Sequence, residues 1–243
     1  MLSHMIPKPS LNIKLLLYYS YLKIKQLKGI EGARQATNLT IVIDIMRAAT
    51  TEAYAFGQGA KYIIPVATKE EAFVLKKENP EYLLMGEIGG YKIEGFDFDN
   101  SPFEIAKIDL TGKTLVHRTS SGTQGVVAAT SAKEIIFGSF VTCSTIVKYI
   151  RAGNHKNISI VAIDSEDDIF ANFLEDSLTG KQLNREEVNQ NLYIHPGTQW
   201  FLDTQKPEFP SEDIDYALDF DKFNFICLVK RNNGQLITNK VTI

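Results

Sequence analysis

Residues 86–102, GEIGGYKIEGFDFDNSP, gather many side-chain oxygens on a glycine-rich stretch. Glu87, Asp97, Asn100 and Ser101 supply the carboxylate, amide and hydroxyl oxygens that a hard cation and its bound phosphate require. Glycine lets the backbone adopt positive φ and approach a ligand closely. The same residue types also form ordinary turns, so a plain surface loop is the alternative interpretation.

A second candidate lies at residues 42–51, VIDIMRAATT, where an apolar run leads into a polar segment. Asp44 and Arg47 follow the run, and Thr50 and Thr51 stand at the expected start of a helix. An anion there would meet unpaired backbone N–H groups, the positive end of the helix dipole and a guanidinium group. The alternative is a capped helix with Arg47 in a structural salt bridge.

Residues 117–125, HRTSSGTQG, repeat this arrangement before another expected helix, and a plain N-capping loop is the alternative. The candidates for substrate binding in this segment are Arg118, Thr119, Ser121, Gly122 and Thr123. A fourth polar segment follows the apolar run at 158–163 and contains Asp164, Glu166 and Asp167. Four apolar runs therefore each lead into residues that could bind a cation or an anion.

Apolar runs that favour strands alternate with helical patterns along most of the chain. The expected strands span residues 13–20, 39–45, 61–67, 82–87, 113–119, 134–139 and 158–163. The expected helices span residues 50–59, 68–79, 122–132, 142–153 and about 167–178, the second opening on the N-cap candidate Thr68. Apolar strands joined by helices predict an α/β fold, a three-layer α/β/α arrangement around a mainly parallel or mixed sheet.

The C-terminal part of the chain has a different pattern. Residues 207–220 predict a short capped helix, and residues 223–241 predict two strands around RNNGQ, where Asn-Gly favours a tight turn. We expect this β-hairpin to pack on one edge of the sheet. Residues 1–243 are expected to form a single α/β domain or two small lobes, with residues 1–10 as a flexible N-terminal tail.

The expected sheet explains how the candidate residues could meet. In open α/β sheets, ligands bind beyond the carboxyl ends of the strands, where loops lead into helices. Asp44, Glu87, the 118–123 segment and the Glu166–Asp167 pair all occupy such positions. The sequence therefore predicts one site built from four strand ends.

Composition restricts the partners. The 243 residues have a formal net charge of -3, a pI near 5.9 and no long run of Lys or Arg, so a nucleic-acid partner is not expected. The apolar run at 13–24 contains Lys14 and Lys23, is too short to span a bilayer and lacks a cleavage site, so no membrane association is expected. Cys143 and Cys227 have no CxxC spacing, which favours the cytoplasm.

Taken in order, VIDIMRAATT, GEIGGYKIEGFDFDNSP, GKTLVHRTSSGTQGV, GSFV and SEDDIFANF resemble the 2-phosphosulfolactate phosphatase family. The most specific element is Gly-Phe-Asp followed by Asn-Ser-Pro at residues 95–102. The resemblance covers residues 38–180 most strongly. It implies a Mg²⁺-dependent hydrolase of a small anionic phosphate monoester, 2-phosphosulfolactate or a related hydroxy-acid phosphate, together with a three-layer α/β fold and a homodimer.

Residue by residue, the resemblance assigns the site. The implied catalytic residues are Asp44, Arg47, Glu87, Asp97, Glu166 and Asp167, and of these Asp44, Glu87, Glu166 and Asp167 are the implied metal ligands. The implied substrate-binding residues are Thr50, Thr51, Asn100, Ser101, Arg118, Thr119, Ser121, Gly122 and Thr123. A metal-activated water is favoured over an aspartyl-phosphate intermediate, because no second Asp lies two residues after Asp44.

Three positions depart from the family pattern. Ile88 and Gln124 stand where better-known members have arginine, and Ser121 stands where they have asparagine. A substrate with a phosphate, a sulfonate and a carboxylate would then lack cationic partners. We therefore expect either a substrate with fewer anionic groups or compensation by Arg118 and Lys92. A catalytically silent member that senses an anionic metabolite is the alternative function.

Overall fold

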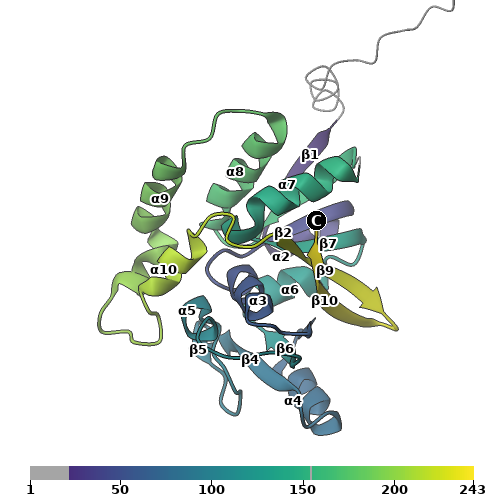
Figure 1. Cartoon of the computed structure of the whole chain (residues 1–243), viewed down its shortest axis with the longest axis vertical. Helices are drawn as coiled ribbons and strands as arrows, with labels where there is room; N and C mark the ends of the chain where they lie inside the picture. The colour runs from purple at the N-terminus through teal and green to yellow at the C-terminus, as the bar shows by residue number, and fades with distance from the viewer. Residues whose placement is uncertain (1–21, 154) are drawn as a thin grey trace, which may run out of the picture.

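The computed structural model describes residues 22–153 and 155–243, whose strands form one mixed sheet (Figure 1). The strands are β1 (Lys23–Lys28), β2 (Asn38–Ile43), β3 (Tyr62–Pro65), β4 (Leu83–Ile88), β5 (Tyr91–Lys92), β6 (Thr114–Arg118), β7 (Ala132–Gly138), β8 (Asn157–Ala162), β9 (Phe225–Asn232) and β10 (Gln235–Thr242). Six of the seven strands expected before residue 180 are confirmed. The seventh, at 13–20, and the tail expected at 1–10 lie outside the described residues.

Helices connect most of these strands. The α-helices are α2 (Gly29–Gln35), α3 (Ala48–Gly57), α4 (Lys69–Glu78), α5 (Pro102–Ile105), α6 (Gly122–Ala128), α7 (Cys143–Ala152), α8 (Asp167–Thr179), α9 (Arg185–Ile194) and α10 (Glu212–Ala217). Two 3₁₀ helices are η1 (Phe140–Thr142) and η2 (Pro196–Leu202). All the expected helices are present, and Thr68 forms the predicted N-cap of α4 in a capping box with Glu71. The cap expected for the helix at 207–220 is not seen, because no side chain caps the start of α10.

The strand order is β1-β8-β2-β7-β9-β10-β3-β6-β4-β5. Strands β1, β8, β2 and β7 are mutually parallel, as are β3, β6 and β4. The antiparallel hairpin of β9 and β10 stands between these two groups, pairing with β7 on one side and β3 on the other. The β10–β3 pairing is a single bridge between Thr238 and Ile63, so the two parallel groups are joined through a narrow seam.

The expectation that the hairpin packs on an edge of the sheet is wrong. The turn itself is as predicted, because Asn233 and Gly234 both adopt the positive φ of a tight hairpin. Residues 225–229 of β9 are all buried, however, which requires cover on both faces of the strand. A strand of this kind belongs in the interior of a sheet.

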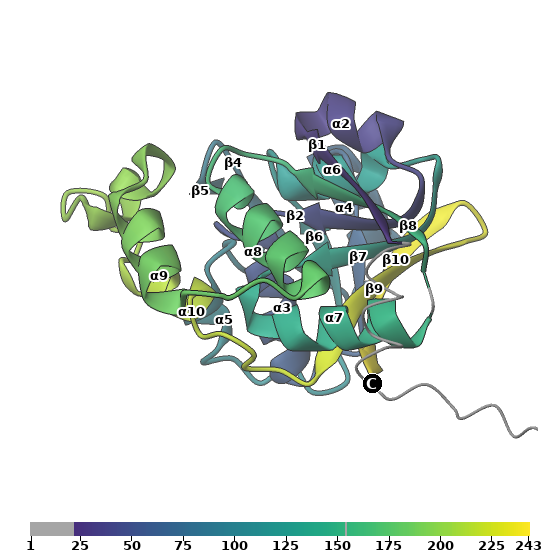
Figure 2. The same cartoon turned by 90° about the horizontal axis from the view of Figure 1, so that it is seen from above.

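Two layers of helices cover the sheet, as the three-layer prediction requires. Helices α2, α3 and α6 pack in one hydrophobic cluster, and α7 and α8 pack in another with the other face of β2, whose alternate residues point to both clusters. Figure 2 shows α2 and α7 on opposite sides of the strands. A smaller cluster lies between α4 and strands β3, β4 and β6.

Several described elements were not expected. They include β1, which pairs along its whole length with β8, the short helix α2, and α9. Helix α9 lies away from the strands in both views, on the left of Figures 1 and 2, and η2 follows it. Within the described ranges, no helix combines the length and the apolar character needed to cross a bilayer.

Candidate active site

A cavity of about 410 Å³ opens where the loops after β2, β6 and β8 meet the end of β4. Its lining residues are Asp44, Met46, Arg47, Glu87, Gly89, Gly90, Asn100, Ser120, Ser121, Asp164, Gly197, Trp200, Phe201 and Phe209. The four strand ends that the sequence predicted to converge do converge. The segment after α9, which no motif indicated, completes the wall.

Asp44 lines this cavity and directly follows β2. Its Oδ1 accepts a hydrogen bond of 3.0 Å from the backbone N–H of Ala48 at the start of α3. The side chain is 4% exposed. Burial, followed by the nearby charges of Asp164, Glu166 and Glu87, raises the pKa of Asp44 to about 8.

The position of the Asp44 carboxylate requires a glycine at residue 122. A Cβ at residue 122 would collide with Asp44 Oδ2 and would lie 2.8 Å from the ring of Phe137. The absence of a side chain therefore lets the β6–α6 loop approach the carboxylate. The sequence prediction placed Gly122 in substrate binding, and the structure gives it close contact with Asp44.

The acids after β8 divide into two kinds. Asp164 lines the cavity, and Glu166 is 7% exposed, with a pKa raised by burial and by the charge of Asp164. Both carboxylate oxygens of Asp167 accept hydrogen bonds from the backbone. Oδ1 accepts from the N–H of Ile45 at 2.7 Å, and Oδ2 accepts from the N–H of Asp164 at 2.9 Å. Burial and the charge of Asp44 raise the pKa of Asp167 well above its ordinary range. Asp167 thus fixes the two loops that carry the other acids.

Glu87 also has its oxygens engaged. Oε1 accepts from the N–H of Ser120 at 2.6 Å, and Oε2 accepts from the N–H of Gly90 at 2.6 Å and from the hydroxyl of Ser120 at 3.1 Å. Arg118 donates from Nη1 to the carbonyl of Glu87 at 2.8 Å and does not line the cavity. Glu87 therefore ties the loop after β4 to the loop after β6.

Arg47 is buried at the cavity wall and already has an anionic partner. Its Nη1 lies 3.1 Å from Oδ2 of Asp213, and its Nη2 donates to the carbonyl of Gly90 at 3.0 Å. The guanidinium carbon is 5.5 Å from the ring centre of Phe201 and 5.4 Å from that of Phe209. Asp213 comes from α10, and no sequence motif pointed to it.

Asn100 reaches the cavity from the loop before α5 and is held by a buried histidine. His117 Nε2 lies 3.1 Å from Asn100 Oδ1, and His117 Nδ1 lies 3.0 Å from Oε1 of Glu52. Both His117 and Glu52 are fully buried. Asn100 Oδ1 faces the histidine, which leaves its amide NH₂ as the group available to the cavity.

Several residues expected to bind substrate instead support the backbone. Thr50 donates to the carbonyl of Ile45, and Thr51 donates to the carbonyls of Arg47 and Asn100. In the 117–125 segment, Thr119 and Thr123 hydrogen-bond to each other's backbone N–H and side chain, while Ser121 lines the cavity. Ser101 caps α5 and donates to Asp213 Oδ1 at 2.6 Å. None of Thr50, Thr51, Ser101, Thr119 and Thr123 lines the cavity.

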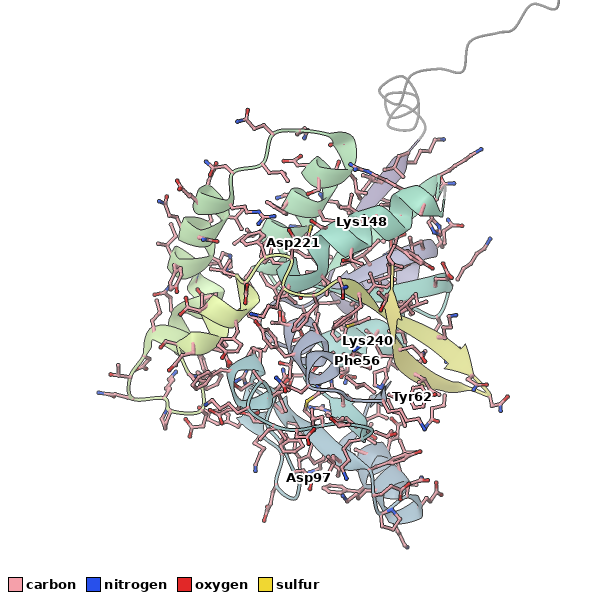
Figure 3. All side chains as sticks on the ribbon, viewed as in Figure 1. Phe56, Tyr62, Asp97, Lys148, Asp221 and Lys240 are labelled. Carbon is pink, nitrogen blue, oxygen red and sulfur yellow. The ribbon has the colours of Figure 1, made fainter. Side chains whose placement is uncertain are left out.

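Asp97 lies apart from the other predicted acids. Figure 3 shows it beside β4 and α4, at the lower edge of the molecule. Its Oδ2 accepts from the N–H of Leu84 at 2.7 Å and lies 3.6 Å from Nζ of Lys76, and its side chain is 35% exposed. The structure therefore does not bring Asp97 to the cavity, and its contacts are those of a residue that fixes the loop after β4.

The acids around Asp44 are of the right type for a hard cation. Carboxylate oxygens are the protein ligands that Mg²⁺ prefers, and the cavity has Asp44 and Asp164 on its wall with Glu166 close by. Over residues 22–153 and 155–243, no three acidic, histidine or cysteine side chains stand ready-assembled as a metal site. A bound ion would therefore require these side chains to close around it.

Comparison with known proteins identifies the family. Residues 25–198 match the family model described as 2-phosphosulpholactate phosphatase. The chain belongs to this family. A probable 2-phosphosulfolactate phosphatase of Bacillus subtilis is 34% identical over 212 residues, which cover 85% of this chain and 93% of that protein.

Two further relatives have the same name. The probable 2-phosphosulfolactate phosphatase of Caldanaerobacter subterraneus subsp. tengcongensis is 32% identical over 82% of this chain and 90% of its own length. That of Caldicellulosiruptor saccharolyticus is 44% identical over 51% of each chain. The family and these relatives are named as phosphatases of a phosphate monoester, so this chain belongs to an enzyme family of phosphoric monoester hydrolases.

The sequence did not indicate several residues of the site. The family motif points to Glu166 and Asp167 as ligands after the 158–163 run, whereas Asp164 is the acid of this segment that lines the cavity. Trp200, Phe201 and Phe209 form the aromatic part of the wall and belong to a segment without a motif. The available signal was their clustering after α9, in a stretch that otherwise lacks apolar periodicity.

Proposed function

We propose that this protein is a Mg²⁺-dependent phosphatase that hydrolyses a small anionic phosphate monoester, 2-phosphosulfolactate or a related hydroxy-acid phosphate. The observation that carries the proposal is the group of buried or cavity-lining acids Asp44, Asp164 and Glu166. Among the described residues that line the cavity, the cationic side chain is that of Arg47, which is paired with Asp213. Carboxylates crowded without a counter-charge oppose each other's ionisation, and a divalent cation would relieve that opposition.

In this proposal, Asp44, Asp164 and Glu166 would hold the ion, because their carboxylates accept fewer backbone hydrogen bonds than those of Glu87 and Asp167. Glu87 and Asp167, which were also expected as ligands, instead hold the loops in place through their hydrogen bonds to backbone N–H groups. When bound, a divalent ion polarises the phosphoryl group and lowers the pKa of a water molecule.

The chain's own groups would orient the substrate. The hydroxyl of Ser121 and the amide of Asn100 can donate hydrogen bonds to phosphate oxygens, and Arg47 supplies positive charge at the wall. Hydrolysis joins a water oxygen to phosphorus and breaks the ester P–O bond, after which the alkoxide takes up a proton. These donors would stabilise charge on the phosphoryl oxygens as that bond breaks.

A phosphate-release assay with Mg²⁺ across small hydroxy-acid phosphates tests the proposal. We expect release that requires the ion and that falls at least about a hundredfold in Asp44→Asn, as for loss of a major charge-stabilising group. Binding of the same esters without any release would instead support the alternative, a sensor of anionic metabolites. That alternative draws support from the hydrogen bonds already made by Arg47 and Glu87.

Two wider expectations remain part of the proposal. The homodimer rests on family resemblance, and sedimentation analysis of the full chain would test it. A reducing, cytoplasmic location is consistent with Cys143 and Cys227, which are both free and buried.

A further inference from the structure

The cavity has two chemically different walls. The strand-end loops supply carboxylates, hydroxyls and an amide, whereas the segment after α9 supplies Trp200, Phe201 and Phe209. Met46 adds a further apolar side chain to the lining. A substrate whose phosphate lies among the acids and their cation would therefore place its organic part within reach of aromatic rings.

The aromatic wall is firmly built. The ring of Phe209 contacts those of Tyr91, Trp200 and Phe201 edge-on, with ring centres 5.4 to 5.5 Å apart. It also packs against Gly90, where a Cβ would collide with the ring. Edge-on ring contacts of this kind hold aromatic side chains in fixed orientations. Phe209 thus fixes the wall, while Trp200 remains 46% exposed and accessible to a ligand.

Charge around the cavity is insufficient for a highly anionic substrate. The lining carries Asp44, Glu87 and Asp164 against Arg47, and Arg47 is already paired. A phosphate monoester brings nearly two negative charges at neutral pH, which one divalent cation can balance. A sulfonate and a carboxylate would add two more, and each unpaired buried charge is strongly unfavourable.

The residues that could compensate do not line the cavity. Arg118 donates to the Glu87 carbonyl, and Gln124 donates to the carbonyls of Ala67 and Thr119. Lys92 is exposed on β5, opposite Glu87 in the strand register. Lys206 contacts the aromatic wall, with its Nζ 3.5 Å from the ring centre of Trp200, but it does not line the cavity.

The wall also lies beyond the residues that the family model matches. The family model ends at residue 198, whereas Trp200, Phe201 and Phe209 follow it. The family model therefore does not describe this half of the cavity.

We propose that the cavity selects phosphate monoesters whose organic part carries an apolar or aromatic group in place of the sulfonate, with at most one further negative charge. The inference rests on the proposed phosphatase function and narrows its substrate class. Trp200 is assigned as the specificity-determining residue, because it combines access to the cavity with an exposed ring.

Three esters that differ only at one carbon test this selection. They are the 2-phosphates of lactate, 3-sulfolactate and 3-phenyllactate, which share the phosphate and the carboxylate and carry a methyl, sulfonate-bearing or phenyl-bearing group. We expect kcat/KM to be highest for the phenyl ester and at least about tenfold lower for the sulfonated one. Equal or better hydrolysis of the sulfonated ester would overturn the inference while leaving the phosphatase function intact. Hydrolysis of none of the three would refute the phosphatase function itself.

Substitution of Trp200 tests whether this side chain determines the preference among the three esters. Trp200→Ala should reduce the phenyl-to-methyl ratio of kcat/KM about tenfold, and Trp200→Arg should raise the sulfonate-to-methyl ratio. Each ratio is measured within one variant, so differences in the folded fraction cancel. Leu202→Ala, at a similarly exposed residue outside the lining, serves as the control and should leave both ratios unchanged. Unchanged ratios in both Trp200 variants would show that the wall does not select the substrate.

Discussion

Replacing Asp44 with asparagine should make the stability of the fold less sensitive to pH and should also remove the activity. The pKa of Asp44 is raised from 3.8 in the unfolded chain to about 8 in the fold. Between these values the folded carboxyl holds a proton that the unfolded one has released. Proton binding therefore favours the folded state at low pH, and the free energy of unfolding falls as pH rises toward 8.

The size of the effect follows from this pKa. From about pH 6 to pH 8, titration of Asp44 alone should lower the free energy of unfolding by about 2 kcal/mol. For a chain of this length that corresponds to a fall in Tm of about 4–8 °C. Asparagine at position 44 keeps an Oδ1 acceptor for the N–H of Ala48 but cannot ionise, so this part of the fall should disappear.

Thermal unfolding at pH 6 and pH 8, with a chelator present, measures the difference between wild type and Asp44→Asn. Asp109→Asn is the matched control, because hydrogen bonds from Thr111 lower the pKa of that exposed acid and it titrates below this range. The fall in Tm between pH 6 and pH 8 should be the same in this control as in wild type. An equal fall in Tm for wild type and Asp44→Asn would refute the assignment of a buried, proton-holding Asp44.

Three further substitutions test individual contacts. Gly122→Ala should lower kcat/KM at least about tenfold, because the new Cβ displaces the carboxylate of Asp44; unchanged kinetics would refute the close approach. Arg47→Ala should reduce the free energy of unfolding by about 3–5 kcal/mol in a denaturant titration, since it leaves Asp213 buried without a cation, and Asp213→Ala in the same chain should restore part of the loss. Asp97→Ala should lower stability by about 1 kcal/mol through a lost backbone hydrogen bond, with turnover per folded molecule within about twofold of wild type; a large loss of turnover would return Asp97 to the catalytic residues.

Local signals in the sequence predicted much of the fold. The apolar run at 39–45 predicted β2, and Thr68 with Glu71 predicted the capped start of α4. Asn-Gly predicted the hairpin turn, but a turn signal does not specify which strands flank the hairpin. The burial of residues 225–229 of β9 decides that, and it depends on helices distant in the chain.

The site could be predicted where its residues follow strands or, as for Asn100, belong to the Asn-Ser-Pro motif. Asp44, Glu87 and Ser121 could be predicted because they lie at or just after the carboxyl ends of strands, and the structure brings them to one cavity. Asp213 and Phe209 could not be found this way, because the chain returns to the cavity through a segment whose path is set by packing. Asp97 fitted a motif, but its carboxylate faces a backbone N–H of β4 rather than the cavity.

Phosphate release from 2-phospholactate, followed during a Mg²⁺ titration of the chelator-treated full chain, tests the central claim most directly. The proposal predicts no release without the ion, saturable release as Mg²⁺ is added, and an apparent Kd for Mg²⁺ at least about tenfold weaker in Glu166→Gln. Release that is unaffected by the chelator, or an identical Mg²⁺ dependence in Glu166→Gln, would contradict the assignment of the cation to the acids around Asp44.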